Sequence, residues 1–209
     1  MDGTKKKLVL AALQLFADQG LDGVSLRQVN SASGAMNASA AHYHFGGKEG
    51  LIVGIFEFIS LEIVDFREKS NKEMQRLAAK DEPKIREILS AAYAPYLFLF
   101  MQPGHGRHCI KFLSRLQMDP EPKNQIPFHA FFAPLMIELL THLQPMLPNK
   151  EPRELKVHLS FSLTSFLQGL AGVDLMANLP FEGLDDIGAS NIFHFSDYFL
   201  DFISAGVGS

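Results

Sequence analysis

Three features of the amino-acid sequence predict an all-α protein with a small N-terminal domain and a larger helical domain. Apolar residues recur every three or four positions along nearly the whole chain, which is the period of amphipathic helices. No stretch alternates apolar and polar residues as a half-buried strand does. Short segments rich in glycine or proline separate the periodic stretches. We therefore expect packed helices without a sheet.

The first helix is predicted near residues 4–20. An apolar stripe at helical spacing is formed by Leu8, Ala11, Ala12, Leu15 and Phe16. Thr4 is a suitable N-cap for this helix, and Gly20 is a suitable residue to end it.

The next two helices are short. In "SLRQ", Ser25 and Gln28 form a capping-box pattern that begins the second helix, and Gly34 permits a tight turn after it. Asn37 is the expected N-cap of a third helix over residues 38–45, and "GG" ends that helix before Lys48 opens a fourth. Three helices with a glycine turn before the third are typical of a helix-turn-helix module.

The rest of the chain keeps the helical period. The fourth helix has an apolar face formed by Leu51, Ile55, Phe58, Ile59 and Ile63. Pro95 is expected to kink a helix near residues 85–101, and Pro134 to interrupt another. "DPEPKNQIP" is expected to be a loop. Long helices are expected at about 151–178, with the stripe Leu155, Leu159, Ser162, Phe166, Leu170 and Val173, and at about 191–205.

Composition limits the possible classes of protein. Hydrophobic residues make up 47% of the chain and charged residues 20%, which is ordinary for a soluble globular protein. The single cysteine, Cys109, excludes a disulfide within one chain. Apolar runs such as "YAPYLFLFM" are shorter than the roughly 18 residues that span a bilayer, so we expect a cytoplasmic protein without a membrane partner. The net charge is −4 overall, but residues 1–50 carry +1, which is weak evidence for an anionic partner.

At this point the N-terminal quarter resembles the DNA-binding domain of the TetR family of transcriptional regulators. "AALQLFADQGLDGVSLRQV" is similar to that family's first two helices, and "YHFGGKEGL" to the end of its recognition helix and the start of helix four. The resemblance spans residues 5–53 approximately. It implies a DNA-binding domain at 1–50 and a helical ligand-binding and dimerisation domain at 51–209. Ala38 stands where the family often has a lysine or arginine.

The resemblance places a recognition helix in the DNA major groove, where side chains of its first turn and outer face read base edges. In this sequence those side chains belong to Asn37, Ser39, Ala40 and His42. The Ala40 methyl is suited to a thymine methyl, and Asn37 to adenine. Phosphate or anchoring contacts are expected from Tyr43, His44, Lys48, Ser25, Arg27 and Gln28. Phe45 is expected to be core.

The resemblance also implies a symmetric dimer on a palindromic double-stranded operator, held together by the helices at about 151–178 and 191–205. It implies a small-molecule effector as well. Aromatic and methionine side chains in the middle helices suit an apolar pocket, and the candidates are Tyr93, Tyr96, Met101, His108, Phe112, Phe132 and Phe166. Arg107, Lys111 or Arg115 near such a pocket would favour an acyl-type ligand. The expected function is a ligand-responsive regulator, with repression as the commoner behaviour in the family.

Other functions have weaker support in the sequence. His42 and His44 diverge by about 200° on a helix, so they are not expected to share a metal, and "HGRHC" has no second cluster at ligand spacing. We expect no metal, cofactor or catalytic residue. A helical-bundle enzyme would need to organise His129, His142, His158 and Asp174, which show no recognisable pattern, and the paired carboxylates Asp185 and Asp186 lie in a loop. The main alternative is a helical small-molecule- or partner-binding protein with weak or lost DNA binding, which Ala38 and the modest +1 charge favour.

Overall fold

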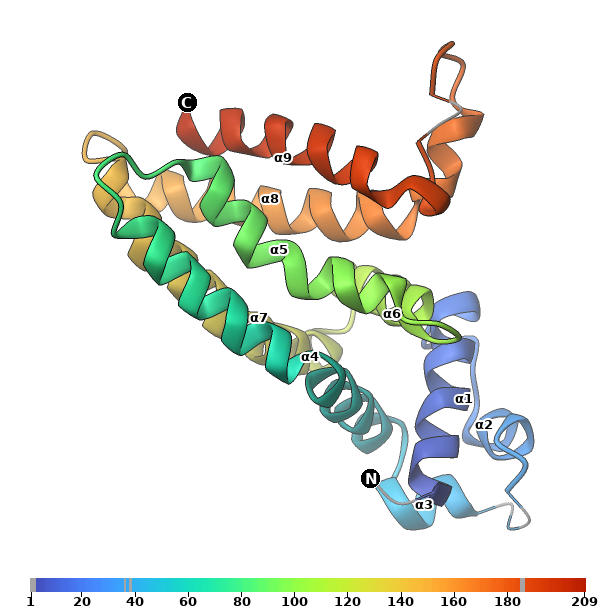
Figure 1. The fold of residues 1–209 in the computed structure, drawn as a ribbon. Coiled ribbons are helices and arrows are strands. Elements are labelled where there is room, and N and C mark those ends of the chain that lie inside the picture. Colours follow the sequence, from blue (N-terminus) through green and yellow to red (C-terminus); the bar gives the residue numbers. More distant parts are fainter. Residues whose placement is uncertain (1–2, 36, 38, 185–186) are drawn as a thin grey trace. The chain divides into compact units, whose positions relative to one another are not determined.

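The structure is a computed structural model that describes residues 3–35, 37, 39–184 and 187–209. Every regular element among these residues is helical, which confirms the all-α prediction (Figure 1). The α-helices are α1 (Gly3–Gln19), α2 (Leu26–Ala32), α3 (Ala40–Phe45), α4 (Lys48–Ala78), α5 (Ile85–Met101), α6 (Gly106–Gln117), α7 (Pro122–Leu143), α8 (Pro152–Ala171) and α9 (Ile192–Gly208). Short 3₁₀ helices lie at η1 (Gln144–Met146), η2 (Val173–Asn178) and η3 (Ala189–Asn191).

The chain forms two compact units. The first unit consists of Met1–Val64 with Tyr96–Ala133, and the second of Asp65–Pro95 with Pro134–Ser209. Helix α6 therefore belongs with α1, α2 and α3, while α4, α5 and α7 each contribute residues to both units. The division of function predicted at residue 50 stays a prediction, because compactness does not test it.

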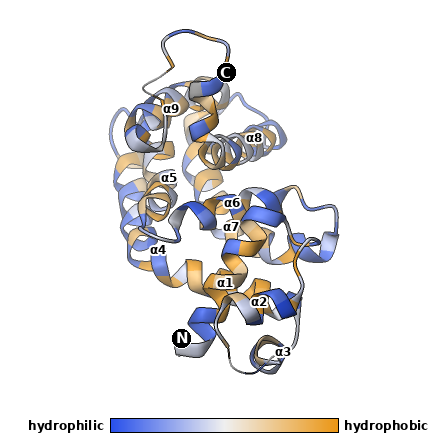
Figure 2. Cartoon of the chain, turned by 90° about the vertical axis from the view of Figure 1, so that its right-hand side faces the viewer, coloured by the Kyte–Doolittle hydropathy of each residue, from blue (hydrophilic) through white to orange (hydrophobic). Residues whose placement is uncertain are grey.

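The core of the first unit is built around α1. The buried residues of α1 include Leu8, Ala12 and Phe16, and hydrophobic positions of α1 lie beside α2 (Figure 2). The Phe16 ring stacks on Phe112 of α6 at a centroid distance of 6.4 Å, and Phe112 meets Phe56 of α4 edge-on at 5.8 Å. Gly20 adopts a φ of 79° and ends α1 as predicted. The predicted N-cap was wrong, because Thr4 lies inside a helix that already includes Gly3.

Helix α4 confirms its predicted apolar face. All five residues of the stripe are buried: Leu51, Ile55, Phe58, Ile59 and Ile63. An α-helix has 3.6 residues per turn, so residues three or four positions apart lie on the same side of this long helix.

The predicted loop "DPEPKNQIP" was only partly right, because α7 already begins at Pro122. Proline suits a first helical position, where no backbone N–H is needed. The Asp119 side chain strengthens this start, since its Oδ1 accepts from the backbone N–H of Glu121 at 2.9 Å and from the Asn124 side chain at 3.0 Å. The expected interruption at Pro134 was wrong, because α7 continues through this residue. Pro95 lies inside α5, and the kink expected there stays a prediction.

One helix is long and apolar enough to cross a membrane when only length and composition are considered. It runs over Pro122–Met146, and a third of its most apolar window is buried inside the protein. The apolar runs read from the sequence were shorter than this helix. This helix contributes four large apolar side chains to the core: Phe128, Phe132, Leu135 and Leu139. A core helix of this length has the apolar composition of a membrane-spanning helix because its side chains pack inside the protein.

The second unit is organised by stacked aromatic rings. Tyr93 of α5 stacks on Phe166 of α8 at 4.4 Å, and Phe199 of α9 lies 5.5 Å from Phe166. The Tyr93 hydroxyl is hydrogen-bonded to Ser162 Oγ at 2.7 Å, so its polar end is satisfied inside the core. The predicted helix at 151–178 ends earlier than expected, at Ala171, and η2 follows it after Gly172.

A buried lysine fastens the end of α9. The Lys150 ammonium donates to the Val207 carbonyl at 2.8 Å and lies 3.1 Å from His158 Nδ1. Its side chain is almost fully buried, and Glu154 Oε1 is 3.8 Å away. The carbonyls at a helix C-terminus carry partial negative charge, so an ammonium at this point satisfies one of them and favours the helix end.

Candidate nucleic-acid interface

The turn between α2 and α3 is held by Asn30. This side chain is buried, and its Oδ1 accepts a hydrogen bond from the Ala41 backbone N–H at 2.8 Å. Its carbonyl accepts from the Ala35 N–H at 3.2 Å, and Gly34 supplies the left-handed turn with a φ of 67°. Asn30 thus joins the end of one helix to the start of the next, eleven residues further on.

The first residues of the recognition helix differ from the prediction. Helix α3 begins at Ala40 instead of Ala38, and Ser39 is its N-cap residue, without a side-chain cap. Asn37 precedes the helix and turns the chain locally, because its Oδ1 accepts from the Ser39 N–H at 2.9 Å and its carbonyl from the Ala40 N–H at 3.1 Å. The predicted helical position Ala38 lies outside the described residues.

Helix α3 has one face in the core and one face in solvent. Ala41 is fully buried and Ala40 is 7% exposed, so the expected contact between the Ala40 methyl and a thymine does not fit its position. His42 is exposed on the outer face, as is Tyr43, which has 82% of its surface exposed and meets the His44 ring edge-on at 5.1 Å. The outer face therefore presents two rings with polar atoms.

Phe45 fixes α3 against α4. A Cβ atom placed on Gly54 of α4 would lie only 2.6 Å from Phe45 Cε1 and 3.5 Å from Val9 Cγ2. The ring therefore packs directly on the backbone of α4, beside a side chain of α1. Phe45 is half-buried, and one side of its ring packs inside the protein on Gly54, as expected of a core residue.

Three of the expected DNA contacts already have partners within the protein. The Ser25 N–H donates to Gln28 Oε1 at 2.8 Å and the Gln28 N–H donates to Ser25 Oγ at 3.3 Å, which confirms the predicted capping box. The Lys48 ammonium donates to the Leu21 carbonyl at 2.8 Å. An ammonium has three N–H donors, so this bond ties α4 to the loop after α1 and leaves further donors. Arg27 is exposed on α2.

A concave surface of about 440 Å³ lies beside the recognition helix. Its lining brings Asn37, Ala40, Tyr43 and His44 together with residues of α1 and of the turn, namely Thr4, Lys7, Ser33, Gly34 and Ala35. From the sequence, the run "KKK" at residues 5–7 was either a solvated arm or a phosphate contact. The place of Lys7 beside α3 was not evident, because it depends on how α1 packs against the turn.

Arg115 of α6 is a further structural residue that the sequence did not reveal. Its Nε donates to the Ala17 carbonyl at 2.7 Å, and one terminal nitrogen donates to the Asp18 carbonyl at 3.1 Å. These carbonyls belong to the last turn of α1, where backbone acceptors have no partner within the helix. Arg115 therefore caps α1 from a helix almost a hundred residues away.

The seven expected ligand-binding residues are distributed over both units. Tyr93 and Phe166 stack in the second unit, and in the first unit Tyr96 stacks on Phe132 at 5.2 Å. The others are Phe112, which is buried beside Phe16, Met101, which is exposed, and His108, whose Nε2 lies 3.8 Å from Asp18 Oδ2. A role for these residues in ligand binding stays a prediction.

Clusters of metal-ligating or catalytic side chains would be a second kind of candidate site. Within the described ranges, no three His, Cys, Asp or Glu side chains gather in a way that holds a metal ion. Cys109 of "HGRHC" is buried, and burial, with the charge of Glu62, raises the pKa of its thiol far above the ordinary range. His105 of the same motif lies 3.0 Å from Glu62. The carboxylates Asp185 and Asp186 lie outside the described residues.

Comparisons with known proteins agree with this architecture. Residues 8–55 match the family described as "Bacterial regulatory proteins, tetR family", and residues 90–206 match "Tetracyclin repressor-like, C-terminal domain". The second match alone covers more than half of the chain. No match to a curated protein is found.

Solved structures share the fold at low sequence identity. A TetR-family transcriptional regulator from Rhodococcus sp. is 12% identical with a TM-score of 0.64, over 97% of this chain and 100% of that chain. The fatty acid degradation regulator FadR from Bacillus halodurans is also 12% identical, with a TM-score of 0.66 over 99% and 97%. A TetR family transcription regulator from Shewanella sp. PV-4 is 15% identical, with a TM-score of 0.60 over 98% and 97%. The chain belongs to the TetR family of bacterial regulatory proteins.

Proposed function

We propose that this protein is a cytoplasmic transcriptional regulator that binds a palindromic operator as a homodimer and is released from DNA by a small effector. One observation carries the proposal: the recognition helix keeps its inner face in the core and exposes His42 and Tyr43 on a short, firmly anchored segment. No enzymatic step is part of the proposal. Repression is the behaviour that we assign to it, with residues 1–50 as the part that reads DNA.

The proposed contacts separate into two kinds. His42 and Asn37 are the candidates for base reading, since both are exposed at the outer part of the module. Arg27, Lys7 and Tyr43 are the candidates for phosphate contacts. Ser39 and His44 border the same surface, while Ser25, Gln28 and Lys48 act mainly by holding the helices in place.

The proposed dimer uses α8 and α9. Both helices expose large apolar side chains, which on α8 are Val157 and Phe161 and on α9 are Phe193, Tyr198 and Phe202. Isolated exposed apolar residues are common, but several on two adjacent helices are typical of a surface that a partner covers. A twofold dimer can hold two recognition helices about 34 to 36 Å apart, which matches successive major grooves.

The proposed effector is small and apolar or acyl-type. A molecule that binds more tightly to a conformation with another spacing of the recognition helices lowers operator affinity by that difference in affinity. The likeness to the fatty acid degradation regulator from Bacillus halodurans, at 12% identity, concerns the fold alone. The acyl character of the effector is thus our proposal, based on Arg107 and Lys111 in α6.

The test begins with selection of duplexes from a random-sequence pool, followed by fluorescence anisotropy of the selected duplex and a scrambled duplex at several salt concentrations. We expect a preference on the order of 10³ or more for the selected duplex. Removing one phosphate contact by Arg27→Ala should reduce the salt slope by about 0.9, and Lys69→Ala, an equal charge loss on an exposed part of α4, should leave the slope unchanged. Equal, weak binding to both duplexes would refute operator recognition and support the alternative, a helical binding protein without DNA function.

A further inference from the structure

A cavity of about 450 Å³ lies in the second unit, between α8, α9 and the segment that connects them. The cavity is lined by residues of four segments, which are Ser165 and Gly169 from α8, Met176 and Leu179 from η2 and the residue after it, Gly183, Leu184 and Ile187 from the connecting loop, and Phe195, Tyr198, Phe199 and Phe202 from α9. This volume lies within the usual range of small-molecule sites, about 300 to 1,000 Å³. None of the seven residues expected to bind ligand is among its lining residues.

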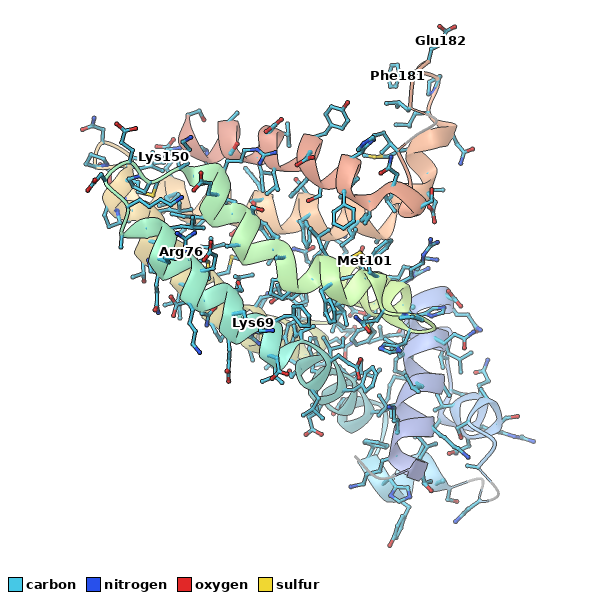
Figure 3. The ribbon with its side chains drawn as sticks, in the orientation of Figure 1. Lys69, Arg76, Met101, Lys150, Phe181 and Glu182 are labelled. Carbon is cyan, nitrogen blue, oxygen red and sulfur yellow. The ribbon has the colours of Figure 1, made fainter. Side chains whose placement is uncertain are left out.

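Helices α8 and α9 and the segment between them line the cavity. Gly169 permits close packing of the two helices, because a Cβ atom there would lie 3.0 Å from Phe195 Cζ. Phe195 and Phe199 stack at 5.9 Å and form an aromatic floor, since both are buried. The connecting segment extends beyond the ends of α8 and α9, with Phe181 and Glu182 at its outer end (Figures 1 and 3). Ile187 of that segment is buried and lines the cavity.

The lining selects the chemistry of a ligand. No lining residue carries a charge, and the side-chain hydrogen-bonding groups in the lining are the hydroxyls of Ser165 and Tyr198. A carboxylate or phosphate would lose its hydration there without a cation to pair with, which is costly. The described ionisable side chains of the connecting segment, Asp174 and Glu182, are acidic and would repel an anion further. An uncharged molecule with apolar or aromatic parts and one or two polar atoms fits this site.

We infer that this cavity binds an uncharged, largely apolar small molecule. Its mouth is bordered by Tyr198 and Phe202, which are 68% and 71% exposed on the surface that we propose for the dimer. A second copy bound to this surface would cover Tyr198 and Phe202 and with them the mouth of the cavity. The bound molecule thus lies beneath that second copy. Of the two effector classes proposed above, this cavity fits the apolar one and not the acyl-type one, because Arg107 and Lys111 are not among its lining residues. The inference rests on the proposed function only in calling this molecule an effector.

The experiment uses the purified full-length protein without DNA and two fluorescent probes, neutral Nile red and anionic 1-anilinonaphthalene-8-sulfonate. We expect saturable binding of Nile red with one site per chain, and at least tenfold weaker binding of the anionic probe. Ser165→Phe places a ring in the cavity from a half-buried position and should weaken Nile red binding at least tenfold. Ser160→Phe, the same change at an exposed position of α8 outside the cavity lining, is the matched control and should bind Nile red as the native protein does.

A second variant guards against misfolding of Ser165→Phe. Leu179 lies at the rim and is 45% exposed, so Leu179→Arg should fold normally while it introduces a charge beside the apolar lining. It should also weaken Nile red binding at least tenfold. The inference is overturned if Nile red does not saturate, if both variants bind it like the native protein, or if binding appears only on dilution to monomers, because a partner side chain then fills the space. None of these results depends on DNA binding, so the two proposals fail separately.

Discussion

The hydrogen bond between Asn30 and Ala41 should determine how firmly the recognition helix is held. Asn30→Ala removes the acceptor and leaves the Ala41 N–H without it at a position that is fully buried. An unsatisfied buried donor costs about 1 to 3 kcal/mol. A helix of six residues has almost no stability of its own, so this cost falls on the docking of α3. Local opening should become about 5- to 140-fold more frequent, given about 1.4 kcal/mol per factor of ten.

Hydrogen exchange measured by NMR is the direct assay. The reporters are the amides of Tyr43 and Gly46, which donate to Ser39 and His42 carbonyls at 2.9 and 2.7 Å. Their protection should fall by the factor given above, while the amide of Gly172 in the second unit keeps its protection. Asn30→Asp is the matched control, because it retains an acceptor near the positive end of α3. Equal protection of Tyr43 and Gly46 in the native protein and in Asn30→Ala would refute this account of the turn.

Three further predictions follow from contacts in the two units. Gly54→Ala should lower the melting temperature, because overpacking against the Phe45 ring costs about 1 to 3 kcal/mol and outweighs a helix-propensity gain of about 1 kcal/mol. Gly206→Ala, in open space on α9, should not lower the melting temperature. Lys150→Ala should reduce the free energy of unfolding by about 1 to 3 kcal/mol in urea titrations, because the end of α9 loses a buried donor. Lys156→Ala, an exposed change on α8, should have little effect, and equal stability of the two variants would contradict the role of Lys150. Cys109 should react with a thiol reagent at pH 8 only after denaturation, because burial raises the pKa of its thiol, and rapid labelling of the native protein would be inconsistent with this. The thiol of the unfolded chain ionises at a lower pH than the buried thiol, so the free energy of unfolding should fall as the pH rises above about 8.5.

The local features of the fold were predictable from the sequence. The Ser25–Gln28 capping box and the stripe on α4 depend on residues three or four positions apart, and both have the predicted form. The start of α3 was not predictable in the same way. An asparagine such as Asn37 can cap a helix or bond two residues ahead, and these local hydrogen bonds have similar energies. In this protein the second arrangement occurs.

The contacts that position the candidate interface were less accessible from the sequence. Asn30 resembles any polar residue near a helix end, and Arg115 resembles an exposed cation, until the folded chain brings their partners to them. Aromatic composition gave no better guide to a cavity. Rings that fill a core, such as Phe132, and rings that line a space, such as Phe199, occur in the same kind of apolar stripe. Only the packing distinguishes them.

The contact of α1 with α6 has a consequence for the construction of hybrid regulators. A graft that transfers only residues 1–50 into a relative would separate Phe16 from Phe112, and would leave the last carbonyls of α1 without the Arg115 guanidinium. The piece that transfers intact is discontinuous, because it needs α6 and its flanking turns as well as the N-terminal helices. Operator specificity should therefore be exchanged between relatives by replacing the exposed residues of α3 in an otherwise unchanged protein. Transfer of residues 1–50 alone should fail.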